Sequence, residues 1–239
     1  DDPKMLETLE SVTKRGVRTP ALVRPDPDGG YEIISGHRRH RASELAGLMD
    51  MPVIIREMTD EEAVIELVDA NIQREDVLPS EKAWAYRMKL EAIKRQGERT
   101  DLTSSQVGMK LQTLEIVGKE AGDSRNQVHR YIRLTELIPE LLSMVDEKKI
   151  ALNPAYELSF LKKDEQTMLL DAMDSEQATP SLSQAQRLKK FSQEGRLSED
   201  SMLAIMSEEK KGDLDKVTFT GDKLRKYFPR SYTPQRIEE

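Results

Sequence analysis

Cysteine is absent from the 239 residues of the chain. Its absence excludes disulfides, thiolate metal sites and a cysteine nucleophile, and it fits a reducing cytoplasm. Aromatic residues are also scarce, at 5%, and no window approaches the apolar run of about 18 residues that a membrane span requires. The composition therefore predicts a cytoplasmic protein with no membrane partner.

Positive charge is in deficit, because the formal net charge is −7 although charged residues make up 34% of the chain. Such a chain is not expected to coat nucleic acid over its whole surface, so any nucleic-acid contact must come from local basic faces. The chain opens on DDPKMLETLE, without an apolar signal core or an initiating methionine. We therefore expect that the native N-terminus lies further upstream.

Short apolar runs bounded by turn residues predict strands within residues 20–25, 31–35 and 51–57. Helical spacing predicts helices over residues 60–70 and from Pro79 to near Gly97. The strands and helices alternate along this part of the chain. A mixed α/β domain over residues 1–97 is the prediction.

The polar segment GERTDLTSSQ follows, and beyond it strand signals almost disappear. Short helices are expected there, separated by turns at Gly122, Pro139, Asn153-Pro154 and Pro180. We predict an all-helical domain over residues 98–195 and a charged helical tail over residues 196–239.

Residues 30–45, GYEIISGHRRHRASEL, predict a strand, a single-glycine turn at Gly36 and a helix with an arginine-rich first turn. The glycine permits a turn that points several N–H groups at one place, and a helix N-terminus adds positive potential there. Arg38, Arg39 and Arg41 add planar donors suited to phosphate oxygens. The segment predicts a polyphosphate site, and the alternative is a solvated basic helix face beside an ordinary turn.

Residues 113–137 predict two helices joined by a tight turn at Gly122, with Asp123 or Ser124 capping the second helix. Near its start this second helix has residue types that read base edges or bind phosphates in the major groove. These residues are Ser124, Arg125, Asn126, Gln127, Arg130 and Tyr131. The segment predicts a helix-turn-helix that binds double-stranded DNA, and the alternative is a helical hairpin with a polar outer face.

The order of these segments resembles the ParB/Spo0J-like partition proteins, in particular those of plasmids and integrative elements. Residues 16–24 (GVRTPALVR) resemble the first box of that family, residues 36–42 (GHRRHRA) its arginine box, and residues 71–76 (NIQRED) its third box. The fold class implied is an α+β ParB/sulfiredoxin-like nucleotide-binding N-terminal domain followed by an all-α helix-turn-helix DNA-binding domain.

The function that the resemblance implies is a CTP-dependent clamp that loads at a centromere-like DNA site for DNA segregation. Such a protein is a homodimer, associated with the nucleoid or a plasmid, and the tail over residues 196–239 would lead to its C-terminal dimerisation region. A ParA-type ATPase is the implied partner, through a segment upstream of Asp1.

The resemblance also implies roles for individual residues. The arginine box would wrap the triphosphate, the first box would lie near the cytosine, and the third box would hold nucleotide and Mg²⁺, with Asn71 as the metal ligand. Carried over, the nucleotide-binding residues are Thr19, Pro20, Gly36, His37, Arg38, Arg39, Arg41, Asn71, Arg74 and Glu75. An asparagine oxygen is a suitable ligand for a hard cation.

This chain departs from the family pattern at His37 and Ala70, where glutamates are common. Because a carboxylate at either place assists magnesium or a hydrolytic water, we predict that CTP hydrolysis is slow or absent. Residues 153–157 (NPAYE) replace the Gly-His-Ala-Arg segment of the family. The preferred DNA sequence is therefore expected to differ from the common chromosomal one.

Two other functions stay open at this point. A transcriptional regulator or a nucleoid-associated spreading protein would use the same helix and the same nucleotide, and a neighbouring ParA-type ATPase gene would favour partition. A small-molecule kinase on the same N-terminal fold is the enzymatic alternative. The lack of cysteine excludes sulfiredoxin chemistry, and a helix-turn-helix has no purpose in a free kinase.

Overall fold

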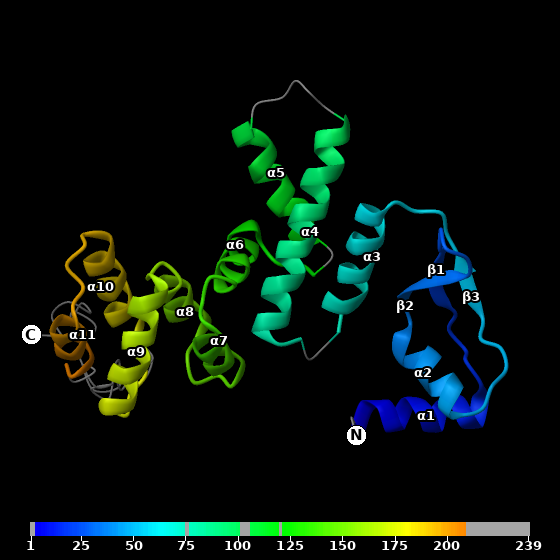
Figure 1. The fold of residues 1–239 in the computed structure, drawn as a ribbon, viewed down its shortest axis with the longest axis horizontal. Helices are drawn as coiled ribbons and strands as arrows, with labels where there is room; N and C mark the ends of the chain where they lie inside the picture. The colour runs from blue at the N-terminus through cyan, green and yellow to red at the C-terminus, as the bar shows by residue number, and fades with distance from the viewer. Residues whose placement is uncertain (1–2, 75–76, 101–105, 120, 209–239) are drawn as a thin grey trace, which may run out of the picture. The chain divides into compact units, whose positions relative to one another are not determined.

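The computed structural model describes residues 3–74, 77–100, 106–119 and 121–208 (Figure 1). Contacts divide the chain into a unit of residues 1–206 and a unit of residues 207–239. The predicted tail falls within the described residues only up to Glu208. Its described part contains the helix α11 (Glu199–Met206), which belongs to the first unit.

The N-terminal region contains a small sheet and four helices that precede its strands, lie between them or follow them, as the mixed pattern predicted. The elements are α1 (Pro3–Arg15), β1 (Ala21–Pro25), β2 (Tyr31–Ser35), α2 (His37–Leu45), β3 (Val53–Ile55), α3 (Asp60–Ile72) and α4 (Pro79–Thr100). The strand order is β2-β1-β3. β1 pairs antiparallel with β2 and parallel with β3, so α2 lies in the crossover that a parallel pair requires.

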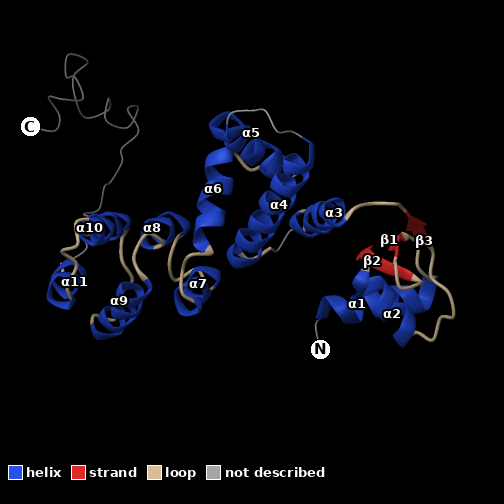
Figure 2. Ribbon diagram, turned by 45° about the horizontal axis from the view of Figure 1, so that its top comes forward, coloured by secondary structure: helices blue, strands red, loops and turns tan. Residues whose placement is uncertain are grey.

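β1 is the central strand, and its burial alternates as the pleat dictates: Ala21 and Val23 are buried while their neighbours are partly exposed. α1 packs against α2, α2 against β1, and α3 against β2. Figure 2 shows α1 and α2 beside the red strands. The start of α2 is therefore positioned directly over the central strand.

The rest of the first unit is helical. Its helices after α4 are α5 (Gln106–Lys119), α6 (Arg125–Leu134), α7 (Pro139–Asp146), α8 (Leu152–Leu158), α9 (Lys163–Ser175) and α10 (Leu182–Gln193), followed by α11. Local signals explain several starts, since Pro79 and Pro139 are first helical residues and the Ser181 side chain accepts a hydrogen bond from Gln184 N.

Three expected boundaries were wrong. α3 continues to Ile72, so Asn71 lies in its last turn and not in a loop. α4 passes through Gly97 to Thr100, because an isolated glycine costs a helix only about 1 kcal/mol relative to alanine. Pro154 lies in the first turn of α8, where a missing N–H is tolerated, and does not mark a turn.

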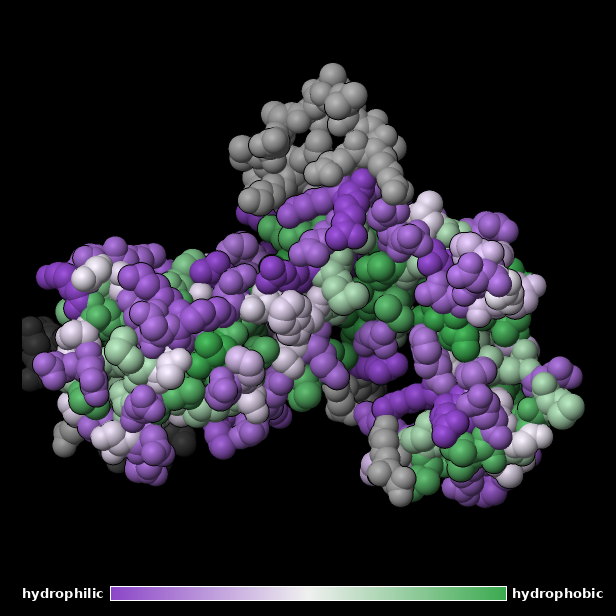
Figure 3. Space-filling model, in the orientation of Figure 1, coloured by the Kyte–Doolittle hydropathy of each residue, from purple (hydrophilic) through white to green (hydrophobic). Residues whose placement is uncertain are grey.

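α4 contributes to both hydrophobic clusters. Ala83 packs in a large cluster that extends to Met206, and Tyr86 packs in a smaller one with Val68, Val117 and Val128. Hydrophilic side chains cover much of the visible surface, with apolar residues between them (Figure 3). Among the described residues no helix is long and apolar enough to cross a membrane.

Candidate nucleotide pocket and nucleic-acid interface

Gly36 forms the turn between β2 and α2. Its φ of 109° lies in the left-handed region, and a Cβ at this position would lie 2.8 Å from the Ala21 Cβ on β1. The residue is therefore required to be glycine both for backbone conformation and for close approach. The Gly36 carbonyl accepts a hydrogen bond from His40 N at 2.9 Å, which begins the first turn of the arginine-rich helix.

Arg39 joins the first box to the arginine box. Its Nη1 donates to the carbonyl oxygens of Thr19, at 2.5 Å, and Pro20, at 2.7 Å. Thr19 and Arg39 also line a cavity of about 330 Å³ together with Gly16 and Arg18, here called the Thr19 cavity. Residues of two sequence motifs therefore meet at one place, with the Arg39 guanidinium directed at backbone carbonyls.

A second cavity, of about 460 Å³, brings Arg38 together with Asn71 and Arg74. It is called the Asn71 cavity below. Arg38 comes from the arginine box and the other two residues come from the third box, so three predicted nucleotide ligands line one cavity. Lys4 of α1 lines it as well, which adds another cation.

α4 supplies a wall of the Asn71 cavity that the sequence did not predict. Glu81, Trp84 and Met88 line it. Trp84 is 48% exposed and is the only tryptophan of the chain. A tryptophan and a methionine four residues apart, and therefore on one helical face, were the sequence signal that could have indicated this wall.

Asn71 is oriented by its own helix. Its Nδ2 donates to the Leu67 carbonyl at 2.9 Å, and its Oδ1 has no hydrogen-bond partner among the residues that the structure describes. Mg²⁺ keeps several waters and takes one or two protein oxygens besides substrate phosphates. The Asn71 oxygen, with the Glu81 carboxylate in the same cavity, fits such an ion, although the described residues contain no cluster of three acids or histidines.

The remaining predicted nucleotide ligands lie elsewhere. Arg41 is exposed and pairs with Glu44 at 3.1 Å, and it lines neither the Thr19 cavity nor the Asn71 cavity. His37 is the first residue of α2 and is exposed. Glu75 lies outside the described residues.

α5 and α6 are joined by a short connection in which Gly122 has a φ of 70°. Ser124 is the N-cap of α6, and its side chain accepts a hydrogen bond from Gln127 N at 3.3 Å. Of the two caps that the sequence allowed, the serine is therefore the one used. Arg125 and Asn126 follow it and are exposed.

Asp123 anchors the same connection to α4. The Tyr86 hydroxyl donates to its Oδ2 at 2.5 Å, and Lys82 Nζ lies 3.2 Å from that oxygen. Burial, reinforced by the Asp123 carboxylate, raises the pKa of Tyr86 well above its usual range, so the hydroxyl remains a donor. At the other end of α6, Arg87 of α4 donates to Thr135 Oγ1 at 2.7 Å.

Arg130 and Tyr131 lie on different sides of α6. Tyr131 is half-buried against α4, with its ring centroid 5.9 Å from that of Tyr86. Arg130 is exposed, its Nη1 donates to Asn153 Oδ1 at 3.1 Å, and its guanidinium carbon lies 6.0 Å from the Tyr156 ring centroid. Gln127 is half-buried. The exposed polar face of α6 thus adjoins the first turn of α8.

Two residues beside this face were not predicted as interface residues. His129 contacts the Tyr156 ring edge-on, with 6.0 Å between centroids. Arg133 donates to the Ser159 carbonyl at 3.0 Å and lies over Phe160. Their spacing from Arg125, four and eight residues along the helix, is the sequence signal that they share its face.

Residues 1–72 match the family described as the ParB N-terminal domain. The chain is 32% identical over 164 residues to the chromosome-partitioning protein Spo0J of Thermus thermophilus, covering 69% of this chain and 54% of that protein. It is 33% identical over 178 residues to the probable chromosome-partitioning protein ParB of Vibrio cholerae, covering 74% and 55%. The chain spans about half the length of these curated relatives.

Solved structures of the C-terminally truncated ParB from Caulobacter crescentus are also similar. One, complexed to the centromeric parS site, is 26% identical, covers 84% of this chain and 87% of that chain, and has a TM-score of 0.48. Another, complexed with CTP-gamma-S, is 28% identical, covers 66% and 80%, and has a TM-score of 0.30.

Proposed function

The chain is a ParB/Spo0J-like protein, and from this membership we propose that it binds CTP and a specific DNA site to act in DNA partition. One observation carries the proposal: Arg38 of the arginine box lines the same cavity as Asn71 and Arg74 of the third box. Residues that are distant in sequence and suited to phosphate and metal are thereby brought together.

In the proposed arrangement the triphosphate occupies the Asn71 cavity. Among the described residues that line this cavity, three have cationic side chains, Lys4, Arg38 and Arg74, and one has a carboxylate, Glu81. Asn71 would hold the Mg²⁺ that accompanies the phosphates, and the cation would offset their charge. Turnover is proposed to be slow, because His37 and Ala70 bring no carboxylate to the site.

The cytosine is proposed to lie toward the Thr19 cavity. Arg39 fixes the backbone of Thr19 and Pro20 through its hydrogen bonds to their carbonyl oxygens, so it would position the pocket for the base. Its guanidinium would reach a phosphate only if these hydrogen bonds were broken. Gly36, which permits α2 to approach β1 closely, holds the two motifs together.

The DNA half of the proposal rests on α6. Its exposed residues Arg125, Asn126 and Arg130 are types that pair with base edges. The helix begins after the Gly122 turn and the Ser124 cap, and its first residues are exposed to solvent. We include a helix-turn-helix mode of binding, a homodimer and a ParA-type ATPase, because the resemblance implies them. The names of the relatives support segregation as the process.

The test is a calorimetric CTP titration of the full chain with Mg²⁺, in which Trp84 emission provides a second, local readout. We expect saturable binding, a change in emission, and loss of both in Arg38→Ala and Arg39→Ala. Arg41→Ala removes the same charge from the same helix outside the cavities and should bind as the wild type does.

Adding cognate duplex should change the CTP affinity, because in a CTP-dependent clamp the binding of CTP and the binding of DNA depend on each other, and such coupling is reciprocal. Equal CTP affinity with and without duplex would contradict this coupling. Absence of CTP binding by the wild-type chain would contradict the nucleotide assignment itself.

A further inference from the structure

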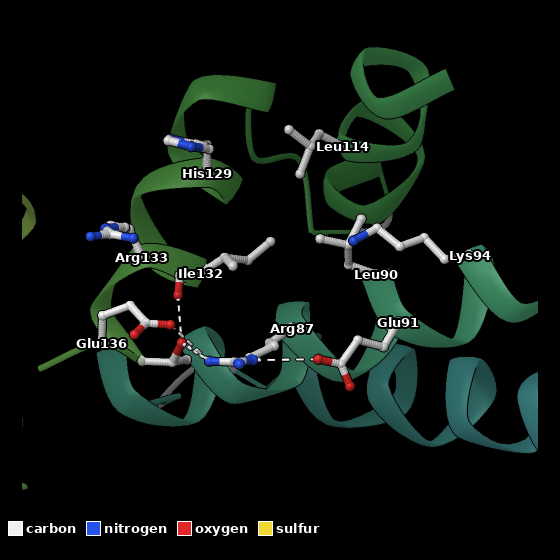
Figure 4. Close-up of a pocket in the computed structure, with 10 residues that line it drawn as sticks. Arg87, Leu90, Glu91, Lys94, Leu114, His129, Ile132, Arg133 and Glu136 are labelled. Atoms are coloured by element: carbon white, nitrogen blue, oxygen red, sulfur yellow. Dashed lines mark hydrogen bonds and ion pairs between the residues drawn. The ribbon is translucent and has the colours of Figure 1, made fainter. Parts of the chain in front are cut away.

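A cavity of about 320 Å³ lies between α4, α5 and α6, here called the α4–α6 cavity (Figure 4). Its lining includes Lys94 from α4, Leu114 from α5, and His129, Ile132 and Arg133 from α6. None of these side chains was among the predicted nucleotide or DNA ligands. The cavity therefore needs an explanation of its own.

On one side of the α4–α6 cavity, the positive charge is balanced by carboxylates. Arg87 pairs there with Glu136, at 3.2 Å, and with Glu91, at 3.4 Å, and its Nη1 also donates to Thr135 (Figure 4). One guanidinium faces two carboxylates, so this side attracts no anion. Any affinity for an anion must come from the remaining cations.

The other cations of the cavity have no acidic partner among the residues that the structure describes. Lys94 is exposed and makes no hydrogen bond or ion pair to a described residue. Arg133 is held in place by the Ser159 carbonyl and by Phe160, whose ring centroid is 4.3 Å from its guanidinium carbon. Arg133 is thus a fixed cation on one side of the cavity, turned toward Ser159 and Phe160, and Lys94 is a free one on the other side. Leu90 and Ile132 lie between them as apolar surface that lowers the local dielectric (Figure 4).

The position of the cavity relative to α6 indicates which anion it meets. Arg125, His129 and Arg133 follow one another at four-residue intervals, so they form a stripe along α6 beside the face with Asn126 and Arg130. When one face of a helix is turned to base edges in the major groove, its flank faces the phosphates of the groove wall. His129 and Arg133 are shared between this flank and the cavity.

We infer that the α4–α6 cavity is a second DNA contact, which holds a backbone phosphate between Lys94 and the His129–Arg133 flank of α6 and carries no sequence preference. The inference rests on the proposed DNA binding by α6. It adds a contact from α4, a helix that also lines the Asn71 cavity.

The experiment measures the affinity of the full chain as a function of salt concentration, for a duplex that the chain enriches from a random pool and for a scrambled duplex of the same composition. Lys94→Ala is compared with Arg95→Ala, which removes the same charge from the next position, also exposed, and lies outside the cavity. Lys94→Arg tests whether the charge alone suffices.

For Lys94→Ala we expect the slope of log affinity against log salt to become less negative by about 0.9 on both duplexes, the value for one phosphate contact. The ratio between the two duplexes should not change, and Arg95→Ala and Lys94→Arg should keep the wild-type slope. An unchanged slope for Lys94→Ala, an equal change for Arg95→Ala, or a lower ratio between duplexes would overturn the inference. If the wild type prefers neither duplex, the proposed DNA recognition fails instead.

Discussion

The N-terminal region up to α3 and the helical region from α4 onward differ in the interactions that stabilise them. Within residues 3–67 the buried apolar side chains are few and mostly small or branched, as with Ala21, Val23 and Ala42. In the helical region a continuous cluster from Ala83 to Met206 buries many leucines completely. Burial of each such side chain contributes about 1.5 to 3 kcal/mol, so the helical region has much the larger hydrophobic stabilisation.

The N-terminal region relies instead on close backbone approach and on hydrogen bonds. Gly36 brings α2 onto β1, and Arg39 binds the carbonyls of Thr19 and Pro20. A region with little core is where a ligand changes stability most visibly, because bound ligand adds RT ln(1 + [L]/Kd) to the folded state. The proposed nucleotide site therefore lies in the region best able to respond to it.

Gly36→Ala should give the largest effect. The new Cβ would meet Ala21 on the central strand while the backbone keeps a φ of 109°, and we expect a loss of about 2 to 4 kcal/mol from strain and overpacking. Amide hydrogen exchange should accelerate in β1, β2 and α2 and remain unchanged in α8 to α10. CTP binding should be lost.

Gly122→Ala is the matched control in the helical region. Its φ of 70° is also left-handed, but nothing lies within 4 Å of the added Cβ. We expect a cost of about 1 kcal/mol, the backbone term alone. Equal costs for the two substitutions would show that the close approach to Ala21 contributes nothing.

Arg130→Ala should come next, with an effect confined to DNA. If Arg130 meets a base edge, affinity for the enriched duplex should fall by about 1 to 3 kcal/mol while that for a scrambled duplex falls less. Asn153→Ala removes the hydrogen-bond partner of the Arg130 guanidinium and should lose less DNA affinity than Arg130→Ala does, because the guanidinium that contacts the base remains. Filter binding on the two duplexes measures both, and an equal loss on both would make Arg130 a phosphate contact.

The features that the sequence predicted correctly are local. The strand, glycine turn and helix around Gly36 depend on neighbouring residues, and so do the Gly122 turn and the cap of α6, which the sequence left between Asp123 and Ser124. The end of α3 was missed because the polar run after Asn71 is typical of a loop, whereas packing of Ile72 in the core extends the helix. Local propensity is a weak guide where tertiary burial decides.

The candidate site was predicted in part, since Arg38, Asn71 and Arg74 line one cavity. What could not be predicted depends on contacts between distant residues: the α4 wall with Trp84, the Asn153 side chain at Arg130, and the cavity at Lys94. The spacing of apolar residues in one sequence does not indicate which helices pack together. The roles of these residues and the boundaries at 97 and 195 stay predictions.

Tyr86→Phe should have the smallest effect, about 1 kcal/mol, because Asp123 keeps its ion pair with Lys82 when the hydroxyl is removed. The loss should be confined to the helical region and leave exchange in β1 unchanged. The folded pKa of Tyr86 is raised, so its contribution is complete below the unfolded pKa of about 10 and declines above it. Urea unfolding at neutral and alkaline pH should therefore show the wild type and Tyr86→Phe converging as pH rises. A difference that stays constant with pH would mean that the pKa of Tyr86 is the same in the folded and unfolded states, which would contradict both its burial and its hydrogen bond to Asp123.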